Sequence, residues 1–261
     1  MAVNAYQSQL YLWKKRTLYI GEFSEPLKLS QGAATLSVSL GEPCSFQVQG
    51  MLKPIHTKSL IIPAGLTVRV DTKDSLIANC HLDVLGQDFY YLFAQAQNNC
   101  CQLGYDLEHE GHLIERFSSM FNTQMQSKEA FEYLENTLTN KCDSPLPPFP
   151  IDSRIEKVIE TIQATVNDTI TGEALAESVN LSIPRLAQVF KKQTGIPIRR
   201  YRLWHRLYIT AQNVGLGKNL TDAALDAGFT DSPHFTHTFK AMLGITPSYI
   251  LSQVNKTRII I

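Results

Sequence analysis

The chain has 261 residues, 44% of them hydrophobic and 18% charged, which leaves room for two ordinary domains and excludes a largely disordered protein. Residues 1–143 hold 11 basic and 15 acidic residues, a charge of −4, whereas residues 144–261 hold 13 and 9, a charge of +4. No run of eighteen apolar residues occurs and the first residues lack a signal-peptide pattern, so we expect a cytoplasmic protein with no membrane partner.

From residue 6 to about residue 88 the sequence consists of short β-type runs separated by turn residues. In residues 34–40, apolar side chains alternate with threonine and serine, which indicates a strand with one apolar face. The pattern predicts an antiparallel barrel or sandwich. The expected strands are residues 10–14, 17–23, 35–40, 44–48, 59–62, 66–70 and 77–82. The expected interior side chains are Leu18, Ile20, Leu36, Val38, Phe46, Val48, Ile61, Val68, Val70 and Leu82.

Residues 87–98 are aromatic and fit either a strand or a helix. Two helical segments follow, at residues 110–121 and 128–139, with apolar side chains at helical spacing. Such apolar faces suit either packing on the β-domain or pairing with a second subunit.

The five cysteines, at positions 44, 80, 100, 101 and 142, are odd in number and show no metal-ligand spacing. Cys100 and Cys101 are neighbours, too close for ordinary pairing. We expect reduced thiols, with redox sensing as the less favoured alternative.

Residues 142–150 contain four prolines, so this stretch is predicted to be a stiff, extended linker between two domains. An amphipathic helix is expected after it, over residues 151–166.

One segment occurs twice in the second half, at residues 182–196 and again at residues 231–245. Each copy opens with an N-capping side chain, Ser182 or Asp231, and places a proline in the first helical turn. Each ends at a glycine, Gly195 or Gly244, with a proline soon after it. Because a short alanine-rich run precedes each copy, the repeat predicts two helix-turn-helix units, at about residues 172–195 and 220–244.

The second copy carries the more specific pattern: Ala224, Ala227-Gly-Phe-Thr-Asp-Ser232, Phe235, Phe239-Lys240, Gly244 and Thr246-Pro-Ser248. This pattern resembles the DNA-binding domain of the AraC/XylS family of bacterial transcription regulators, over about the last hundred residues. The resemblance implies a cupin-like sensory domain at the N-terminus and helices at about residues 105–141 that pair two subunits. It also implies that a helix over residues 199–214 holds the two units apart, so that their second helices enter successive major-groove turns about 34 Å apart.

The turn at residues 62–65, Ile-Pro-Ala-Gly, looks like the second half-motif of a cupin barrel. A metal-binding cupin also needs an early His-x-His pair and a further histidine soon after this turn. Here the early strand region has no histidine, and the position after the turn is Val68. We therefore expect no metal, no cofactor, no catalytic residue and no enzymatic activity.

These features predict an α+β multidomain protein. Its N-terminal domain, residues 1–141, is expected to be an antiparallel, cupin-like β-barrel with a helical hairpin. Its C-terminal domain, residues 151–254, is expected to be all-α with two helix-turn-helix units, joined to the first by the linker at residues 142–150.

Helical geometry separates inward from outward side chains in each predicted reading helix. The expected DNA-base contacts are Ile183, Pro184, Arg185, Ala187 and Gln188 in the first unit, and Ser232, Pro233, His234, Thr236 and His237 in the second. The expected phosphate contacts are Lys191, Lys192, Arg199, Arg200, Arg202 and Lys240. Family members commonly carry arginine at the places of Gln188 and His237; glutamine instead suits adenine.

The leading hypothesis is a sequence-specific transcription regulator that binds double-stranded DNA. Its other candidate partners are a second copy of the chain, a small-molecule effector and RNA polymerase. The alternatives are a cupin-type enzyme with an accessory basic domain and a regulator that senses no ligand.

Overall fold

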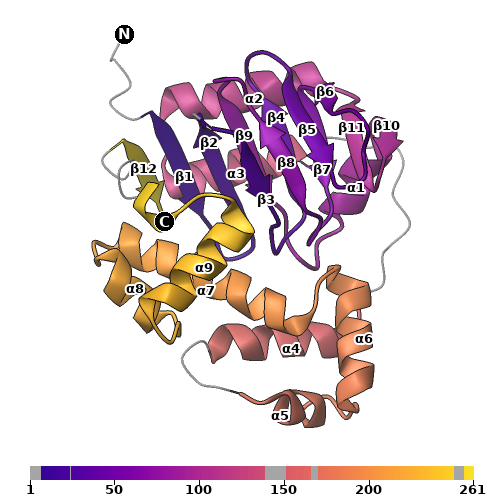
Figure 1. The fold of residues 1–261 in the computed structure, drawn as a ribbon, viewed down its shortest axis with the longest axis vertical. Coiled ribbons are helices and arrows are strands. Elements are labelled where there is room, and N and C mark those ends of the chain that lie inside the picture. The colour runs from indigo at the N-terminus through magenta and orange to yellow at the C-terminus, as the bar shows by residue number, and fades with distance from the viewer. Residues whose placement is uncertain (1–6, 24, 139–150, 166–169, 250–255) are drawn as a thin grey trace.

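The computed structural model describes residues 7–23, 25–138, 151–165, 170–249 and 256–261. A β-rich N-terminal part and a helical C-terminal part lie one above the other in Figure 1. This arrangement confirms the predicted order of a β-rich domain followed by an all-α domain. The predicted linker at residues 142–150 and Cys142 lie outside the described residues.

The N-terminal strands, together with β12 from the C-terminal end of the chain, form an eight-stranded sheet with the order β10-β11-β7-β4-β9-β2-β1-β12 and a four-stranded sheet with the order β3-β8-β5-β6. The paired strands are antiparallel in the described residues, with the exception of β1 and β12. The bounds are β1 Ser8–Leu12, β2 Thr17–Gly21, β3 Leu27–Leu29, β4 Thr35–Ser39, β5 Cys44–Val48, β6 Ile55–Thr57, β7 Ser59–Ile62, β8 Val68–Asp71, β9 Ile77–His81, β10 Ala96–Cys100, β11 Leu103–Leu107 and β12 Thr257–Ile260. Residues 87–98 divide into a short helix, α1 Asp88–Ala94, and the start of β10.

The large sheet buries apolar side chains on both of its faces. Its inner face shares a core with the small sheet, in which Phe46, Val48, Val68 and Val70 lie as predicted. The other predicted interior side chains, Leu18, Ile20, Leu36, Val38, Ile61 and Leu82, belong to a second core on the opposite face, under the helices. The prediction that they line the same interior was wrong, because alternation shows which residues share a face and not which layer covers that face.

The polar face of β4 is buried as well. Thr35, Ser37 and Ser39 are 1%, 2% and 1% exposed. Ser37 Oγ donates to Asn79 Oδ1 on the neighbouring β9, and Thr35 Oγ1 donates to Gln31 Oε1 at 2.6 Å. Because these hydroxyls have partners, a polar face can lie inside the protein at little cost.

The helical hairpin covers the outer face of the large sheet. It consists of α2 Glu110–Thr123 and α3 Ser127–Leu138, close to the predicted bounds. Its apolar side chains Phe117 and Leu134 are fully buried in the core on that face. Of the two roles considered for this face, these side chains therefore serve packing.

A strand beyond the helix-turn-helix units returns to the N-terminal sheet. β12 pairs in parallel with β1, with Ser8 opposite Thr257 and Tyr11 opposite Ile260. Ser8 Oγ and Thr257 Oγ1 are 2.7 Å apart, and Arg258 Nη1 donates to the Gln124 carbonyl at 2.6 Å. β12 thus ties a segment after the two helix-turn-helix units to the edge of the N-terminal sheet.

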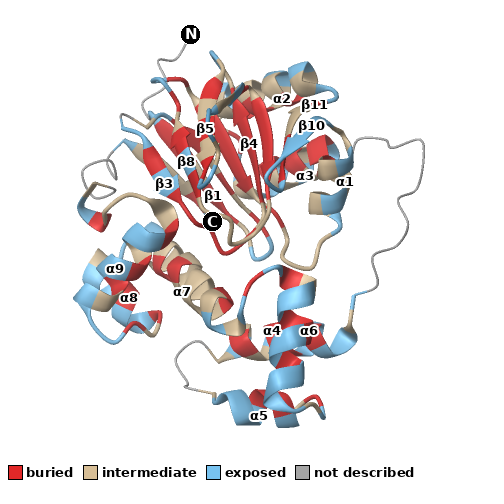
Figure 2. Cartoon of the chain, turned by 45° about the vertical axis from the view of Figure 1, so that its right-hand side comes forward, coloured by how far each residue is buried: buried red, intermediate tan, exposed pale blue. Residues whose placement is uncertain are grey.

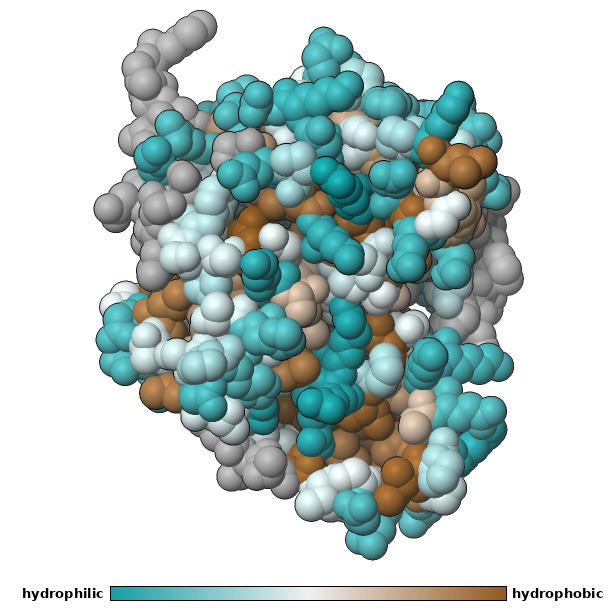
Figure 3. Space-filling view, in the orientation of Figure 1, coloured by the Kyte–Doolittle hydropathy of each residue, from teal (hydrophilic) through white to brown (hydrophobic). Residues whose placement is uncertain are grey.

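The C-terminal part is helical apart from β12. Its bounds are α4 Ser153–Ala164, α5 Gly172–Glu177, α6 Ile183–Thr194, α7 Ile198–Gly215, α8 Leu220–Asp226 and α9 Ser232–Leu243. Buried residues lie on the inner sides of these helices, while α5 and α6 expose broad outer faces (Figure 2). No helix in the described ranges is long and apolar enough to cross a membrane. Hydrophilic side chains cover most of the face seen in Figure 3, with smaller hydrophobic areas between them.

Candidate nucleic-acid interface

The first helix-turn-helix unit consists of α5 and α6. The side chain of Ser182 accepts a hydrogen bond from the Arg185 amide at 3.4 Å, so α6 begins at the predicted cap. The helix ends at Gly195, whose φ of 78° is left-handed and disfavours other residues. Leu186 and Phe190 are buried in a core shared with α4, α5 and α7, which directs the opposite face of α6 outward.

The second unit repeats this construction with α8 and α9. Asp231 accepts from the His234 amide at 2.7 Å, and Gly244 ends the helix with a φ of 75°. Phe235 and Met242 pack on Ala224, Ala227 and Phe229 of the preceding helix and turn, with Leu207 of α7 in the same core. The two units therefore have equivalent local structures, as the sequence repeat predicts.

The candidate base contacts lie on the outer faces of α6 and α9. All ten are exposed except His234, which is half-buried. Its Nδ1 lies 3.1 Å from Thr230 Oγ1, and its ring meets Phe229 edge to face at 5.4 Å. In α6, Arg185 Nη1 donates to Gln188 Oε1 at 2.7 Å, so these two polar groups present a joint surface.

The candidate phosphate contacts divide into two groups. Lys191, Lys192, Arg199 and Lys240 are exposed. Arg200 and Arg202 are half-buried and hold backbone carbonyls of other segments. Arg202 Nη2 donates to the Ile170 carbonyl at 2.6 Å, and Arg200 Nη2 donates to Ser30 Oγ at 2.7 Å. In this structure Arg200 therefore joins α7 to the N-terminal domain, a contact that no sequence pattern indicates.

A groove of about 710 Å³ lies between α6, α7 and α9 on one side and residues 64–66 and 102 of the N-terminal domain on the other. Lys191, Arg199, Arg200, His234 and His237 line its C-terminal side. Gly65, Leu66 and Gln102 line its N-terminal side. The groove is therefore rich in basic groups, and α9 faces the N-terminal domain across it.

α9 also touches the N-terminal domain directly. The Ser30 amide donates to the Met242 carbonyl at 3.0 Å, and a Cβ on Gly244 would lie 2.8 Å from the Lys28 carbonyl oxygen. The C-terminal end of α9 is therefore in direct contact with β3 and the residue that follows it.

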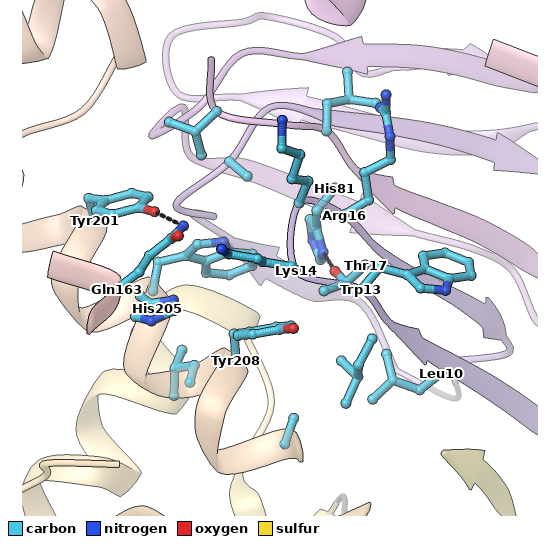
Figure 4. Close-up of a pocket in the computed structure, with 18 of the residues that line it drawn as sticks. Leu10, Trp13, Lys14, Arg16, Thr17, His81, Gln163, Tyr201, His205 and Tyr208 are labelled. Atoms are coloured by element: carbon cyan, nitrogen blue, oxygen red, sulfur yellow. Dashed lines mark hydrogen bonds between the residues drawn. The ribbon is translucent and has the colours of Figure 1, made fainter. Parts of the chain in front are cut away.

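A second cavity, of about 150 Å³, lies between β1, the turn before β2, and α7. Figure 4 shows Tyr201, His205 and Tyr208 on the helical side and Lys14, Thr17 and His81 on the N-terminal side. The walls are largely apolar, with Leu10, Leu12, Trp13, Leu82, Val84, Trp204, Leu207, Ala211 and Leu243 among the lining residues. This cavity depends on the docking of two domains, which no local sequence pattern reveals.

Two histidines of this cavity have buried ring nitrogens without partners. His81 meets Trp204 edge to face at 4.8 Å, and the Nε2 atoms of His81 and His205 have no hydrogen-bond partner in the described structure. Loss of solvent around the rings lowers the pKa of each from 6.5 to about 4. Both imidazoles are therefore neutral at pH 7.

This desolvation makes the domain contact sensitive to acid. Between pH 6.5 and pH 4 the unfolded chain binds more protons than the folded one, so stability is complete above pH 6.5 and declines as the pH falls. At pH 5 we expect each histidine to reduce the free energy of unfolding by about 1 to 2 kcal/mol relative to pH 7. Urea unfolding at both pH values measures this loss, and it should be smaller by one histidine's share in His205→Gln. An equal loss in that variant would contradict the assignment.

Comparisons with known proteins agree with this geometry. A family model described as a helix-turn-helix domain matches residues 175–253. The transcriptional activator RhaR of Escherichia coli strain K12 is 28% identical over 107 residues, which cover 40% of this chain and 37% of RhaR. The chain thus matches little more than a third of the length of that curated relative.

Solved structures of ToxT from Vibrio cholerae are similar over both parts of the chain. A lysine-to-alanine variant of ToxT from strain SCE256, in its apo form, gives a TM-score of 0.61 at 12% identity, covering 96% of this chain and 98% of ToxT. Wild-type ToxT of the same strain bound to unsaturated fatty acid gives 0.56 at 14% identity, covering 97% and 98%. Similarity at this level of identity shows the shared two-part fold, and the sequence match falls on the repeated helical units. Residues 175–253 of this chain thus match a helix-turn-helix domain family, and the chain shares the two-part fold of ToxT.

Proposed function

We propose that this protein is a sequence-specific DNA-binding regulator of transcription, in which α6 and α9 enter successive major-groove turns. The observation that supports the proposal most strongly is the pair of equivalent capped helices, each with its predicted base-contact face turned outward. Exposed lysines and arginines flank these faces, as phosphate contacts require. We also propose that the protein works in the cytoplasm.

DNA titrations at several salt concentrations test this proposal. The full chain would be titrated with random-sequence duplex and with the DNA upstream of its own gene. We expect a clear preference for particular sites and a steep decrease in affinity as salt rises. Equal, weak affinity for all duplexes would contradict sequence-specific binding, and a stoichiometric transition metal in the purified protein would favour the cupin-type enzyme instead.

Replacing exposed lysines of α6 should weaken binding without changing its specificity. For Lys191→Ala combined with Lys192→Ala, we expect the slope of log affinity against log salt to decrease by about 2, one unit for each lost phosphate contact. Lys73 is also exposed but belongs to the N-terminal domain, so Lys73→Ala should leave the slope unchanged. Gln188→Ala should instead relax the preference at one base pair; a uniform loss in that variant would argue against base reading.

We further propose that a small amphiphilic carboxylate binds the cavity between the domains and regulates the protein. ToxT, which shares the fold, has been solved with an unsaturated fatty acid and with a naphthalenyl-butenoic acid. The cavity described here offers apolar walls, and Lys14 and Lys15 among its lining residues can meet a carboxylate. Its occupant would contact both domains and so bias their relative position.

Tryptophan fluorescence provides a direct test of the effector. The chain has two tryptophans, Trp13 and Trp204, and both line the cavity. Titration with a monomeric unsaturated fatty acid should change the tryptophan emission until the site is saturated. Lys14→Ala should shift the midpoint of this titration to a higher fatty-acid concentration. A linear, unsaturable change, or one unaffected by loss of the lysine, would contradict the site.

The proposal also includes a homodimer and a contact with RNA polymerase. Sedimentation of the protein with and without DNA tests the homodimer.

A further inference from the structure

The turn between β10 and β11 carries two thiols side by side. Cys100 is the last residue of β10 and pairs with Leu103 of β11, so Cys101 and Gln102 form a two-residue turn. Their φ angles are 51° and 70°, a left-handed conformation that residues other than glycine seldom adopt. Backbone held in such a conformation is often associated with a functional site.

This backbone places the two sulfur atoms close together and in solvent. Cys100 Sγ and Cys101 Sγ are 3.5 Å apart, and both residues are exposed. A disulfide would require the two sulfurs to approach to about 2.05 Å. The Cα atoms of adjacent residues also lie closer together than those of ordinary disulfide partners. A single atom bonded to both sulfurs at about 2.3 Å, the usual length for a metal thiolate, would instead subtend an angle of about 99° without moving them.

We propose that Cys100 and Cys101 form a chelating dithiol site for thiophilic trivalent metalloids, of which a trivalent organoarsenical is the simplest representative. A pyramidal arsenic(III) centre forms bonds at angles close to this value. In an organoarsenical, one of its three bonds is already made to carbon. It therefore needs two thiols from the protein, which is what the turn supplies. The inference is independent of the proposed DNA binding.

The binding step involves no oxidation or reduction. An arsine oxide reacts with two thiols: the two S–H bonds and the bonds from arsenic to oxygen break, two As–S bonds form, and one water molecule leaves with both protons. Arsenic remains trivalent. Because the second thiol reacts within the same molecule, its effective concentration is high, and a monothiol in solution competes poorly.

The other described cysteines are unsuited to this reaction. Cys44 and Cys80 are fully buried, and burial raises the pKa of the Cys80 thiol to about 12. The pair also borders the basic groove, because the next residue, Gln102, lines it together with His234 and His237. A ligand on the thiols therefore adds bulk beside the helix that we propose reads DNA.

Phenylarsine oxide is a suitable probe. The full chain carrying Cys142→Ser, so that this thiol takes no part, would be reduced, freed of reductant and given one equivalent of the arsenical. We expect one adduct per chain in the intact mass spectrum, loss of two reactive thiols, persistence in excess glutathione and reversal by dithiothreitol.

Single substitutions make the test specific. Cys100→Ser and Cys101→Ser should each weaken binding by at least about a hundredfold, the advantage expected for an intramolecular second ligand. Cys44→Ser should bind as the parent does. Two thiols that remain reactive after one equivalent, or an adduct equally stable in Cys100→Ser, would overturn the proposal. Both serine substitutions lie at exposed positions, so circular dichroism should confirm an unchanged fold.

Discussion

Replacing Arg16 by alanine should reduce the free energy of unfolding by about 3 to 5 kcal/mol, the largest effect that we expect from one polar side chain. Arg16 is 8% exposed and joins three segments. Its Nε donates to Glu135 Oε1 of α3 at 2.6 Å, and its Nη1 donates to Asp88 Oδ2 of α1. Removal of the guanidinium takes this cation away from Asp88 and Glu135, whose side chains are 16% and 35% exposed. Urea unfolding of the full chain measures the change.

Two further variants separate this explanation from a general effect of lost charge. Arg16→Lys keeps the charge but cannot direct two donors to two acceptors, so it should retain part of the stability. Lys218→Ala removes an equally short ion pair, with Asp226 at 2.6 Å, but both of its side chains are about half exposed. That change should cost less than about 1 kcal/mol. Similar losses in Arg16→Ala and Lys218→Ala would show that burial is not what makes Arg16 important.

Replacing Gly32 by valine should raise DNA affinity by roughly 5- to 100-fold. A Cβ at Gly32 would lie 2.4 Å from both Cβ and Cγ of Trp204 on α7, atoms too near the helix backbone to move aside alone. Such overpacking typically costs about 1 to 3 kcal/mol, which the protein can relieve by separating the two domains. If α9 is restrained by its contacts with Ser30 and Lys28, separation increases the fraction of molecules able to bind DNA. Titration against the preferred duplex measures the gain.

Gly111→Val is the matched control, since a Cβ at Gly111 has no neighbour within 4 Å in the described residues. It should leave affinity unchanged. Unchanged or weaker binding by a folded Gly32→Val protein would mean that the docked arrangement is already able to bind DNA.

Local signals in the sequence predicted the helix-turn-helix units well. Ser182, Asp231, Gly195 and Gly244 define helix ends through interactions within a few residues, so their roles can be read without knowledge of the fold. The predicted strands correspond to β1, β2, β4, β5, β7, β8 and β9, whereas β10, β11 and β12 were missed, although they have four or five residues each. β10 is largely exposed and polar, so it shows no apolar alternation. β3 and β6 have three residues each, too few to show a period.

Features that depend on distant segments could not be predicted. An arginine such as Arg200 can serve equally as a phosphate contact, so the sequence does not reveal its role. Its hydrogen bond to Ser30 shows that it joins the two domains in this structure. Likewise, His81 and His205 carry no signal in the sequence, because their burial results from the docking of α7 on the sheet. The candidate DNA-reading face was therefore predictable, whereas its restraint by the N-terminal domain was not.

The pairing of β12 with β1 also has a consequence for biosynthesis. Ser8 and its partner Thr257 are 249 residues apart, so translation at about 5 to 20 residues per second leaves the outer edge of β1 open for on the order of 10 to 50 s. An uncovered strand edge can pair with other chains, which makes the nascent N-terminal domain prone to aggregation until the ribosome has passed the helix-turn-helix units. A fragment ending at residue 138 would keep that open edge permanently, so separate production of the N-terminal domain should require a substitute strand.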